Sequence, residues 1–420
     1  MKVLLVNNFF YDRGGDCTYF FSLKKLLEEK GHQTMVFSMH HPLELDSNYS
    51  KYFVSYIDYA EEVKSISLIS GLRVLQRAVF SQEAKAKIEK LIKDEKPDIA
   101  HLQNIHHHIT PSILYSLRRN KIPVIWTLHD YTLICPNTSF LCHGKICERC
   151  KKIKYYWSPI VRCKKKSFAA SAMAAIESTI HLIMGIRDLV DSYIAPSYFM
   201  KKKTIDYGLR SNKVVHINSF IDSNTVKHQA SEGDYYLYVG RLSEEKGVKT
   251  LIDAAVRVVD LGLEIIGDGP LAKELNRYAN SKDRKDVIGF LGHRNHKEVI
   301  KYLANCRFAV TPSEWYENLP YSILETFACG KPVIGARIGG IPELVVNGET
   351  GLLFEPGNAE DLAEKIQWMF EHPEECREMG RKARMLVEME YTPELHYKRL
   401  MEVYRAAFAK HGKDITKLTF

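Results

Sequence analysis

The sequence predicts an α/β protein built from two doubly wound domains, each a parallel β-sheet between helices. The chain has 420 residues, which is more than one hydrophobic core usually serves. Short apolar runs alternate with amphipathic helical stretches in both halves, as in parallel sheets made of βα units. We expect one domain over residues 1–218, a polar linker over 219–234, a second domain over 235–392, and a closing helix within 393–420.

The first half begins with an expected strand and helix. Val3–Val6 is a short apolar run typical of a buried strand. Apolar residues then recur at helical spacing from Cys17 to Leu27, and Gly31 closes this helix. Further strands are expected at Met35–Ser38, Ile99–Gln103, Val124–Leu128 and Ser192–Ala195.

The second half repeats this alternation. Strands are expected at Tyr236–Val239, Leu263–Ile266, Val287–Leu291, Phe308–Thr311 and Val333–Ala336. Helices are expected at Val248–Val259, Leu271–Asn280, Lys297–Ala304, Tyr321–Ala328 and Pro393–Lys410. Ligands of such sheets bind at the carboxyl ends of the strands, so the loops that follow the strands are the places to look for functional residues.

The composition is ordinary for a globular protein, but the charge is basic. Hydrophobic residues make up 45% and charged residues 26% of the chain, and the formal net charge is +8. Much of the excess lies in lysine clusters at 151–152, 164–166 and 201–203. Nucleic acid, an anionic membrane face or phosphate-bearing substrates can attract such charge. A solvated basic surface without a partner explains it equally well.

The N-terminal segment predicts a cytosolic protein. Its apolar run is short, and no small-residue cleavage site follows it. The nearest candidate for a membrane span, Phe168–Ile186, contains Glu177 and His181. Nine cysteines without a secretion signal favour reduced thiols over a disulfide framework.

Two glycine-containing loops suit phosphate binding. Gly14 and Gly15 lie between the first strand and the first helix, where glycine lets the backbone approach an anion; an ordinary tight turn explains the pair equally well. The pair is not G-x-G-x-x-G, so no nicotinamide or flavin cofactor is indicated. The loop Gly240–Gly247 follows a strand and carries Arg241 and Lys246. The guanidinium of Arg241 can donate to two phosphate oxygens at once, and the ammonium of Lys246 is a mobile positive charge, so the two suit a diphosphate.

Two glutamates flank the start of a predicted helix. Glu317 lies in the loop before the helix, Glu325 lies on its second turn, and Asn318 and Pro320 suit the entry. Carboxylates accept paired hydrogen bonds from the vicinal hydroxyls of a sugar or a ribose. Glutamates at this spacing also occur by chance on surfaces.

Two further loops follow strands. Gly339 and Gly340 supply flexible backbone after the strand Val333–Ala336. His129 ends a strand of the first domain and is expected to face a cleft between the domains. There it can donate to a hydroxyl or carry a proton.

Together and in this order, the motifs resemble those of family 4 retaining glycosyltransferases. The resemblance rests on Gly240–Gly247, Glu317–Glu325, Gly339–Glu343 and Thr350–Phe354. It implies the GT-B fold, in which two Rossmann-like domains face one another across a cleft and the closing helix within 393–420 returns to the first domain. It also implies transfer of a sugar from a nucleotide-sugar donor with the anomeric configuration retained.

The resemblance implies a role for each motif. Arg241 and Lys246 would bind the donor diphosphate, Glu317 the donor sugar and Glu325 the ribose, while His129 would help hold the transferred sugar. Further donor contacts are expected from Gly14, Gly15, Gly240, Asn318, Leu319, Pro320, Gly339 and Gly340. The early loop reads Gly-Gly-Asp-Cys and the glutamate motif Glu-Asn-Leu-Pro; both depart from the family pattern and leave the donor sugar open.

We expect catalysis without a cofactor or a metal at the reacting centre, since no Asp-x-Asp motif is evident. The expected acceptor is a glycan or a lipid-linked molecule in surface polysaccharide biosynthesis, and no nucleic acid is expected as a partner. The lysine clusters favour a cytoplasmic protein held peripherally on the anionic inner face of the plasma membrane. Two alternatives stay open: a nucleotide-sugar epimerase on the same fold, and a non-catalytic protein that binds membranes or polyanions.

Five cysteines fall in one connecting region after His129. Cys147 and Cys150 have the two-residue gap of a metal knuckle, and with Cys135 and Cys163 they can form a tetrahedral structural zinc site. Such a metal would order a long loop. Free or redox-labile thiols are the alternative. The remaining candidate ligands are Cys142 and His143.

Overall fold

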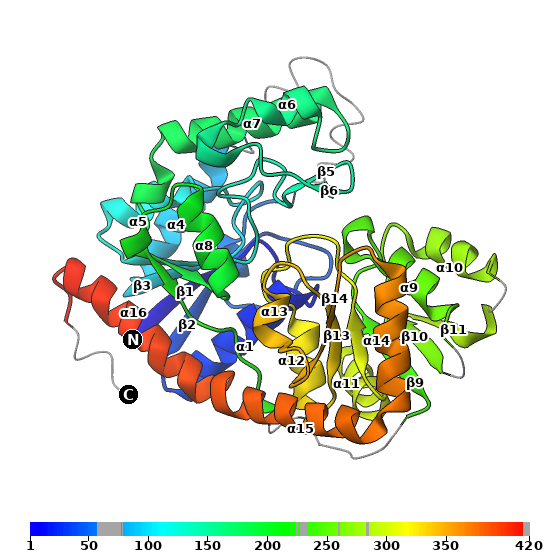
Figure 1. Ribbon diagram of the computed structural model, residues 1–420. Helices are drawn as coiled ribbons and strands as arrows, with labels where there is room; N and C mark the ends of the chain where they lie inside the picture. The colour runs from blue at the N-terminus through cyan, green and yellow to red at the C-terminus, as the bar shows by residue number, and fades with distance from the viewer. Residues whose placement is uncertain are drawn as a thin grey trace. The chain divides into compact units, whose positions relative to one another are not determined.

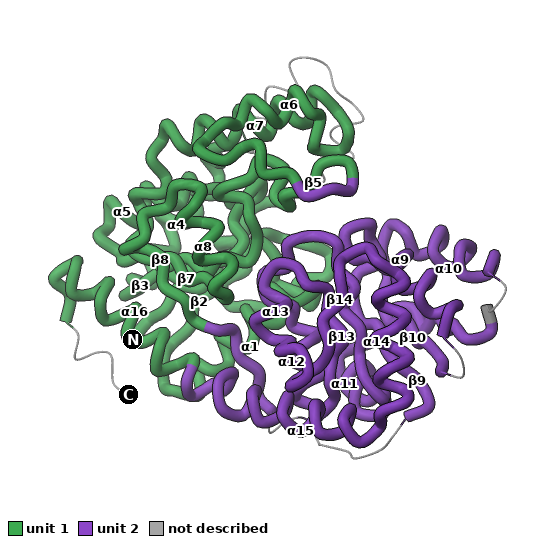
Figure 2. The backbone as a smooth tube through the Cα atoms, in the orientation of Figure 1, with its two compact units in different colours: residues 1–143, 147–217, 396–420 green, residues 144–146, 218–395 purple. Residues whose placement is uncertain are grey.

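The computed structural model describes residues 1–56, 77, 79–223, 226, 233–258, 261–282 and 285–414 (Figure 1). The chain divides into two compact units (Figure 2). The first contains residues 1–143, 147–217 and 396–420, and the second contains residues 144–146 and 218–395. Within the expected linker, residues 224–225 and 227–232 lie outside the described residues, as does Val259 at the expected end of a helix.

The first unit is built on a six-stranded parallel sheet with the strand order β2-β1-β3-β4-β7-β8. Its strands are β1 (Lys2–Val6), β2 (Gln33–Phe37), β3 (Ile99–Leu102), β4 (Val124–Thr127), β7 (Ser192–Ala195) and β8 (Val214–His216). All residues of β3, β4 and β7 are buried. This explains why these strands appear in the sequence as continuous apolar runs and not as alternating patterns.

The helices of the first unit are α1 (Gly15–Glu29), α4 (Gln82–Glu95), α5 (Ile113–Arg119), α6 (Trp157–Val161), α7 (Phe168–Ile183), α8 (Tyr198–Asp206) and, from His396 onward, α16 (Pro393–Lys410). Ser81, Ser167 and Ser197 begin α4, α7 and α8, and each side chain accepts a hydrogen bond from a backbone N–H of the first turn. The cysteine-rich region contains a short hairpin of β5 (Leu141–Cys142) and β6 (Lys145–Ile146).

Helix α16 supports the elements that carry the site loops of the first unit. The Tyr404 hydroxyl lies 2.7 Å from Nδ1 of His101 on β3, and Nε2 of the same ring lies 2.7 Å from the Thr127 hydroxyl on β4. Nε2 of His396 lies 3.1 Å from the Tyr19 hydroxyl on α1. Burial lowers the pKa of His101 to about 3, so a neutral imidazole ties β3, β4 and α16 together.

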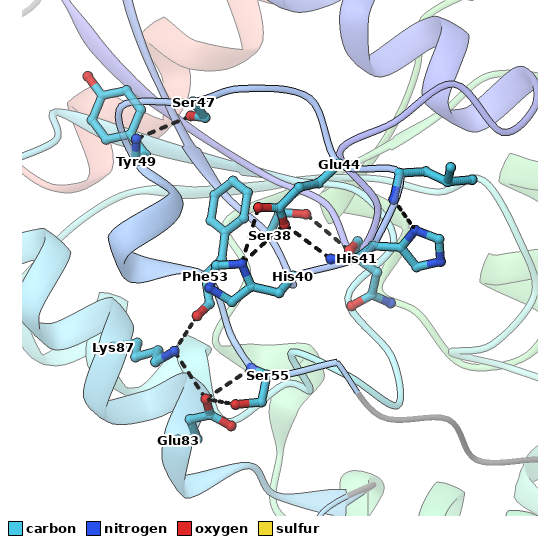
Figure 3. Close-up of polar contacts among 12 residues, drawn as sticks. Ser38, His40, His41, Glu44, Ser47, Tyr49, Phe53, Ser55, Glu83 and Lys87 are labelled. Carbon is cyan, nitrogen blue, oxygen red and sulfur yellow. Dashed lines mark hydrogen bonds and ion pairs between the residues drawn. The ribbon is translucent and has the colours of Figure 1, made fainter. Parts of the chain in front are cut away.

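The segment after β2 is held by local polar contacts (Figure 3). The Glu44 carboxylate lies 3.1 Å from Nδ1 of His40 and accepts the backbone N–H of His41. The Glu83 carboxylate accepts from the Ser55 hydroxyl at 2.8 Å and pairs with Lys87 at 3.1 Å. These contacts hold the segment together and join its end to the first turns of α4.

The second unit is a second six-stranded parallel sheet, with the order β11-β10-β9-β12-β13-β14. Its strands are β9 (Tyr235–Val239), β10 (Gly262–Ile266), β11 (Ile288–Gly292), β12 (Ala309–Thr311), β13 (Val333–Ala336) and β14 (Gly351–Phe354). Its helices are α9 (Val248–Ala255), α10 (Ala272–Asn280), α11 (His296–Asn305), α12 (Tyr321–Ala328), α13 (Ile341–Leu344), α14 (Ala359–Glu371) and α15 (Pro373–Glu390). One hydrophobic core spans the unit.

Candidate functional site

The strand order of the second unit reverses between β9 and β12, where the chain has its topological switch point. Open α/β sheets bind ligands outside the carboxyl ends of the strands at such a point. The loop after β9 carries Arg241 and Lys246, and the loop after β12 carries Glu317. The predicted diphosphate and sugar residues therefore lie where this class of fold places its ligands.

Lys246 and Glu317 form a short ion pair. Nζ of Lys246 lies 2.6 Å from Oε1 of Glu317, which also accepts the Ser313 hydroxyl at 2.6 Å. The Glu317 side chain is only 8% exposed. Burial acts to raise the pKa of this carboxyl, but the Lys246 charge and the hydrogen bonds to Lys246 and Ser313 outweigh burial, so the pKa is lowered. The site thus holds a buried carboxylate beside a half-buried cation.

Glycines are required where these loops pack together. Gly247 has a φ of 65°, and a Cβ there would lie 1.9 Å from the Pro312 carbonyl oxygen. Gly339 has a φ of 62°, and its Cβ would lie 2.3 Å from the Glu317 carbonyl oxygen. The Gly340 N–H donates to that same oxygen at 2.8 Å. Gly339 and Gly340 therefore pack directly against the backbone of Glu317 and hold its loop in place. The sequence had suggested only that they supply flexible backbone.

Arg241 differs from Lys246 because it is exposed. Its backbone is fixed: the Tyr238 hydroxyl donates to the Arg241 carbonyl at 2.9 Å. The N–H of the next residue, Leu242, donates to the Asp268 carbonyl at 2.9 Å. A fixed backbone with an exposed guanidinium suits capture of an anion from solvent.

Glu325 makes a separate pair with a histidine. It lies on the second turn of α12, as predicted, and its Oε1 lies 3.0 Å from Nε2 of His296 at the start of α11. The carboxyl is 11% exposed and the histidine 57% exposed. The loop residues Asn318, Leu319 and Pro320 are half-buried, and Pro320 is the N-cap of α12. Glu317 and Glu325 therefore have different partners, which suits contacts to different parts of one ligand.

The first unit also gathers polar groups at its own switch point, between β1 and β3. Gly14 and Gly15 form the N-terminus of α1. The next residue, Asp16, accepts a hydrogen bond of 2.6 Å from the Asn104 side chain in the loop after β3. The residue after the glycine pair thus joins the start of α1 to the loop after β3, a contact that the Gly-Gly-Asp-Cys pattern did not predict.

His129 follows β4, as predicted. Its ring centroid lies 5.1 Å from that of Tyr19, and Nε2 is buried with no hydrogen-bond partner among the described residues. Burial lowers the pKa of His129 to about 4, although the Asp16 charge acts to raise it. A neutral imidazole with an uncommitted nitrogen can make a hydrogen bond to a hydroxyl.

Three polar residues near these loops were not predicted. Ser313 completes the hydrogen bonding of Glu317, and Asp16 contacts Asn104. Gln103 is 1% exposed at the end of β3, and neither side-chain amide atom has a hydrogen-bond partner within the described ranges. The only sequence feature that could have indicated these residues is their position, directly after a strand or at the start of a helix.

The four cysteines predicted to bind zinc line one small cavity. Its volume is about 10 Å³, and Cys135, Cys147, Cys150 and Cys163 all contribute to its wall. All are free thiols, and burial raises the pKa of Cys135 to about 11 and that of Cys150 to about 12. Among the described residues, however, no three of these sulfur atoms lie within 4.8 Å of one another. The spare candidates Cys142 and His143 both contact the Val161 carbonyl.

The lysine clusters differ in their surroundings. Lys151 contributes with Arg149, Lys152, Lys154 and Trp157 to an open hollow of about 590 Å³. Lys203 instead pairs with Glu148. Large apolar side chains are exposed in the same part of the chain, namely Ile153, Tyr156, Ile160, Phe168, Ile176 and Ile183. In the described part of the chain, no helix combines the length and apolar character needed to cross a bilayer.

Two family models match the chain. The model for Glycosyltransferase Family 4 matches residues 13–225. The model for Glycosyl transferases group 1 matches residues 221–385. The first of these covers the loops of the first unit, and the second covers the Arg241, Lys246, Glu317 and Glu325 motifs.

Individual relatives agree with these models. An uncharacterised glycosyltransferase of Methanocaldococcus jannaschii is 33% identical over 190 residues, and the match spans 45% of this chain and about half (52%) of that relative. The N-acetyl-alpha-D-glucosaminyl L-malate synthase of Bacillus anthracis is 24% identical over 91% of both chains. Among solved structures, Anabaena HepE in complex with UDP-glucose superposes with a TM-score of 0.68 at 17% identity, over 96% of this chain and 99% of that one. The predicted GT-B fold is confirmed.

Proposed function

Because this chain belongs to glycosyltransferase family 4, we propose that it transfers a hexosyl group from a nucleoside-diphosphate sugar to a glycan or lipid-linked acceptor, with retention of configuration. Surface polysaccharide synthesis is the proposed setting. The observation that carries the proposal is the contact between Lys246, Glu317 and Ser313 at the switch point of the second sheet. This contact places a cation, which can bind a diphosphate, beside a buried carboxylate, which can accept hydrogen bonds from sugar hydroxyls.

The proposed division of labour follows from charge and exposure. The exposed Arg241 captures the diphosphate, and Lys246 neutralises it as the bond to the sugar breaks. Glu317 accepts hydrogen bonds from the sugar hydroxyls, while Glu325 does the same for the ribose. In the first unit, His129 is neutral at physiological pH and makes a hydrogen bond to the transferred sugar.

Retention is proposed to follow because the acceptor hydroxyl attacks the anomeric carbon on the same face from which the diphosphate leaves. The leaving phosphate oxygen would take the proton of the acceptor hydroxyl, so that no enzymic nucleophile is required. The bond from the anomeric carbon to the diphosphate breaks, and the bond to the acceptor oxygen forms. Charge neutralisation by Arg241 and Lys246 would be the main contribution of the protein.

The lipid-linked form of the acceptor is supported by the surface of the first unit. Exposed apolar residues lie among the lysines of residues 151–166, and Ile183 at the end of α7 is 80% exposed. An anionic membrane attracts basic residues at its surface. We therefore propose a peripheral attachment that brings the enzyme to an acceptor held in the membrane.

A thermal-shift screen against nucleotide sugars tests the donor site. A ligand that binds the native state stabilises it by about 2.7 kcal/mol at a hundred times its dissociation constant. We expect one group of nucleotide sugars to raise the melting temperature of the wild type, and to raise that of Lys246→Ala much less. Incubating the selected donor without an acceptor then separates the alternatives, because an epimerase converts the donor alone. No shift with any nucleotide sugar contradicts the proposal.

A further inference from the structure

A buried cluster of metal-binding side chains lies in the first unit, outside the groups proposed to act in transfer. His106 lies in the loop after β3, whereas Glu177 and His181 lie one turn apart on α7. One candidate ligand atom from each side chain lies within 4.8 Å of the other two. The three residues are 6–8% exposed. His106 thus meets two residues of α7 that lie 71 and 75 positions further along the chain.

The cluster leaves polar atoms unsatisfied. Both ring nitrogens of His106 and Oε1 of Glu177 are buried without a hydrogen-bond partner among the described protein groups. Nδ1 of His107 approaches the same carboxyl oxygen at 3.4 Å. Buried polar groups are normally paired, because burial without a partner forfeits their hydration. A ligand with positive charge would satisfy the carboxylate and both imidazoles at once.

The surroundings prepare the imidazoles to act as ligands. Nε2 of His181 donates to the Val79 carbonyl at 2.9 Å, which leaves the lone pair on Nδ1. Metal-binding histidines commonly donate their other N–H to a carbonyl in this way. The His106 ring packs against Trp126 of β4, with centroids 5.4 Å apart.

We propose that His106, Glu177 and His181 bind a divalent transition-metal ion such as zinc. Two imidazole nitrogens and one carboxylate oxygen form a common zinc ligand set that leaves a fourth position for water. Zinc–ligand distances of about 2.0–2.2 Å place tetrahedral ligand atoms roughly 3.4 Å apart, so modest side-chain rotation closes the site. The charge of Lys164 acts on Glu177 and His106, and its half-exposed side chain can turn to solvent when the ion binds. The ion would fasten α7 to the loop after β3.

Cobalt binding tests this site separately from the cysteines. The protein is purified without a histidine tag, stripped with a chelator and titrated with Co²⁺ in a Cys147→Ser background. We expect one equivalent to bind with visible d–d absorption and without the sulfur-to-cobalt charge-transfer band that thiolates give. His181→Ala and Glu177→Gln should each weaken cobalt binding at least tenfold. His32→Asn is the matched control, since it removes another buried histidine of the same unit that contacts Tyr397, and it should bind as the parent does.

Folding is checked by circular dichroism for every variant. If the variants fail to fold, the spectrum and stoichiometry of the Cys147→Ser protein still decide the question. Zinc should also raise the melting temperature of that protein after chelation. Absence of a one-equivalent cobalt spectrum, or unchanged cobalt affinity in folded His181→Ala, overturns the proposal. Because these readouts need no sugar donor, they are independent of the proposed transferase activity.

Discussion

Lys246 is the residue on which the proposed donor chemistry depends most. Its ammonium contacts Glu317 at 2.6 Å and lies 5.2 Å from the centre of the Trp315 ring. A donor diphosphate would share this ammonium, while Glu317 turns its second oxygen toward the sugar. The same cation lowers the pKa of Glu317, and in the proposed mechanism it would also receive the leaving group.

Removing either cation of the loop after β9 should slow transfer strongly. We predict that Arg241→Ala and Lys246→Ala each lower turnover about a hundredfold or more, because one preorganised donor to a leaving group contributes about 3–4 kcal/mol. Steady-state kinetics with a labelled donor measures the effect. Lys249→Ala is the control, since this lysine is exposed on α9 in the same part of the chain. Wild-type turnover in the Arg241/Lys246 double variant would refute the site.

The two glutamates should have different effects. We predict that Glu317→Gln lowers turnover more than nucleotide affinity, and that Glu325→Gln lowers nucleotide affinity more than turnover. The reason is their separate pairing, with Lys246 and His296 respectively. Titration of both variants with the free nucleotide measures affinity, and kinetics measures turnover. Equal losses of nucleotide affinity in the two variants would count against the assigned roles.

Among the secondary-structure elements, sequence patterns predicted the strands of the two six-stranded sheets except β8 and β14, and the helices α1, α9, α10, α11, α12 and α16. Ser192–Ala195, Tyr321–Ala328 and Pro393–Lys410 have the predicted bounds. Helices α4, α8, α14 and α15 were not predicted. Of these, only α8 has a weak apolar pattern, whereas α4, α14 and α15 bury residues at helical spacing that the sequence patterns did not single out. The positions of Arg241, Glu317 and Glu325 relative to strands and helices were predictable from motifs and caps.

Contacts between distant segments could not be predicted. The stretch Phe168–Ile186 suggested an apolar segment interrupted by Glu177 and His181. In the structure it is α7, and these two residues meet His106 at its buried face. Likewise, the Asp16–Asn104 hydrogen bond joins residues 88 positions apart. Neither contact has a local sequence signal, since strand order alone brings the segments together.

The cysteine-rich connection is the element for which we predict a structural metal. Metal analysis of untagged protein should give near-stoichiometric zinc at Cys135, Cys147, Cys150 and Cys163, in addition to any ion at His106. Thiolates would rotate into the small cavity that they line. Cys147→Ser should lose that equivalent and melt at a lower temperature, whereas Cys17→Ser, which changes a buried cysteine of α1, should retain it. Zinc content unchanged by Cys147→Ser would exclude this site.

Helix α7 and the lysines before it should attach the first unit to anionic membranes. We predict reversible flotation with anionic liposomes and little with neutral ones, because each basic residue near such a surface contributes about 1 kcal/mol. Changing Lys164, Lys165 and Lys166 to Gln should reduce recovery, while Lys297→Gln and Lys301→Gln in the second unit should not. Equal recovery on both kinds of liposome would remove the electrostatic attachment.

At the scale of the whole molecule, each unit repeats one arrangement. Both are six-stranded parallel sheets, and in both the candidate residues follow the carboxyl ends of strands: β9 and β12 beside the switch point of the second unit, and β1 and β4 in the first. In the proposed function the second unit would supply the cations and carboxylates for the donor, and the first would supply Gly14, Gly15 and His129. Helix α16 begins after the second unit and from His396 belongs to the first, so the stability of the first unit depends on the C-terminal segment.

The central claim is glycosyl transfer with retention, and the anomeric configuration of the first product tests it most directly. The donor chosen by thermal shift is incubated with protein and a panel of glycan and lipid-linked acceptors, and the product is followed by proton NMR at early times. We expect a new glycosidic bond with the same anomeric configuration as the donor, formed by the wild type and lost in the Arg241/Lys246 double variant. An inverted product, or conversion of the donor to its epimer with no acceptor required, would contradict it.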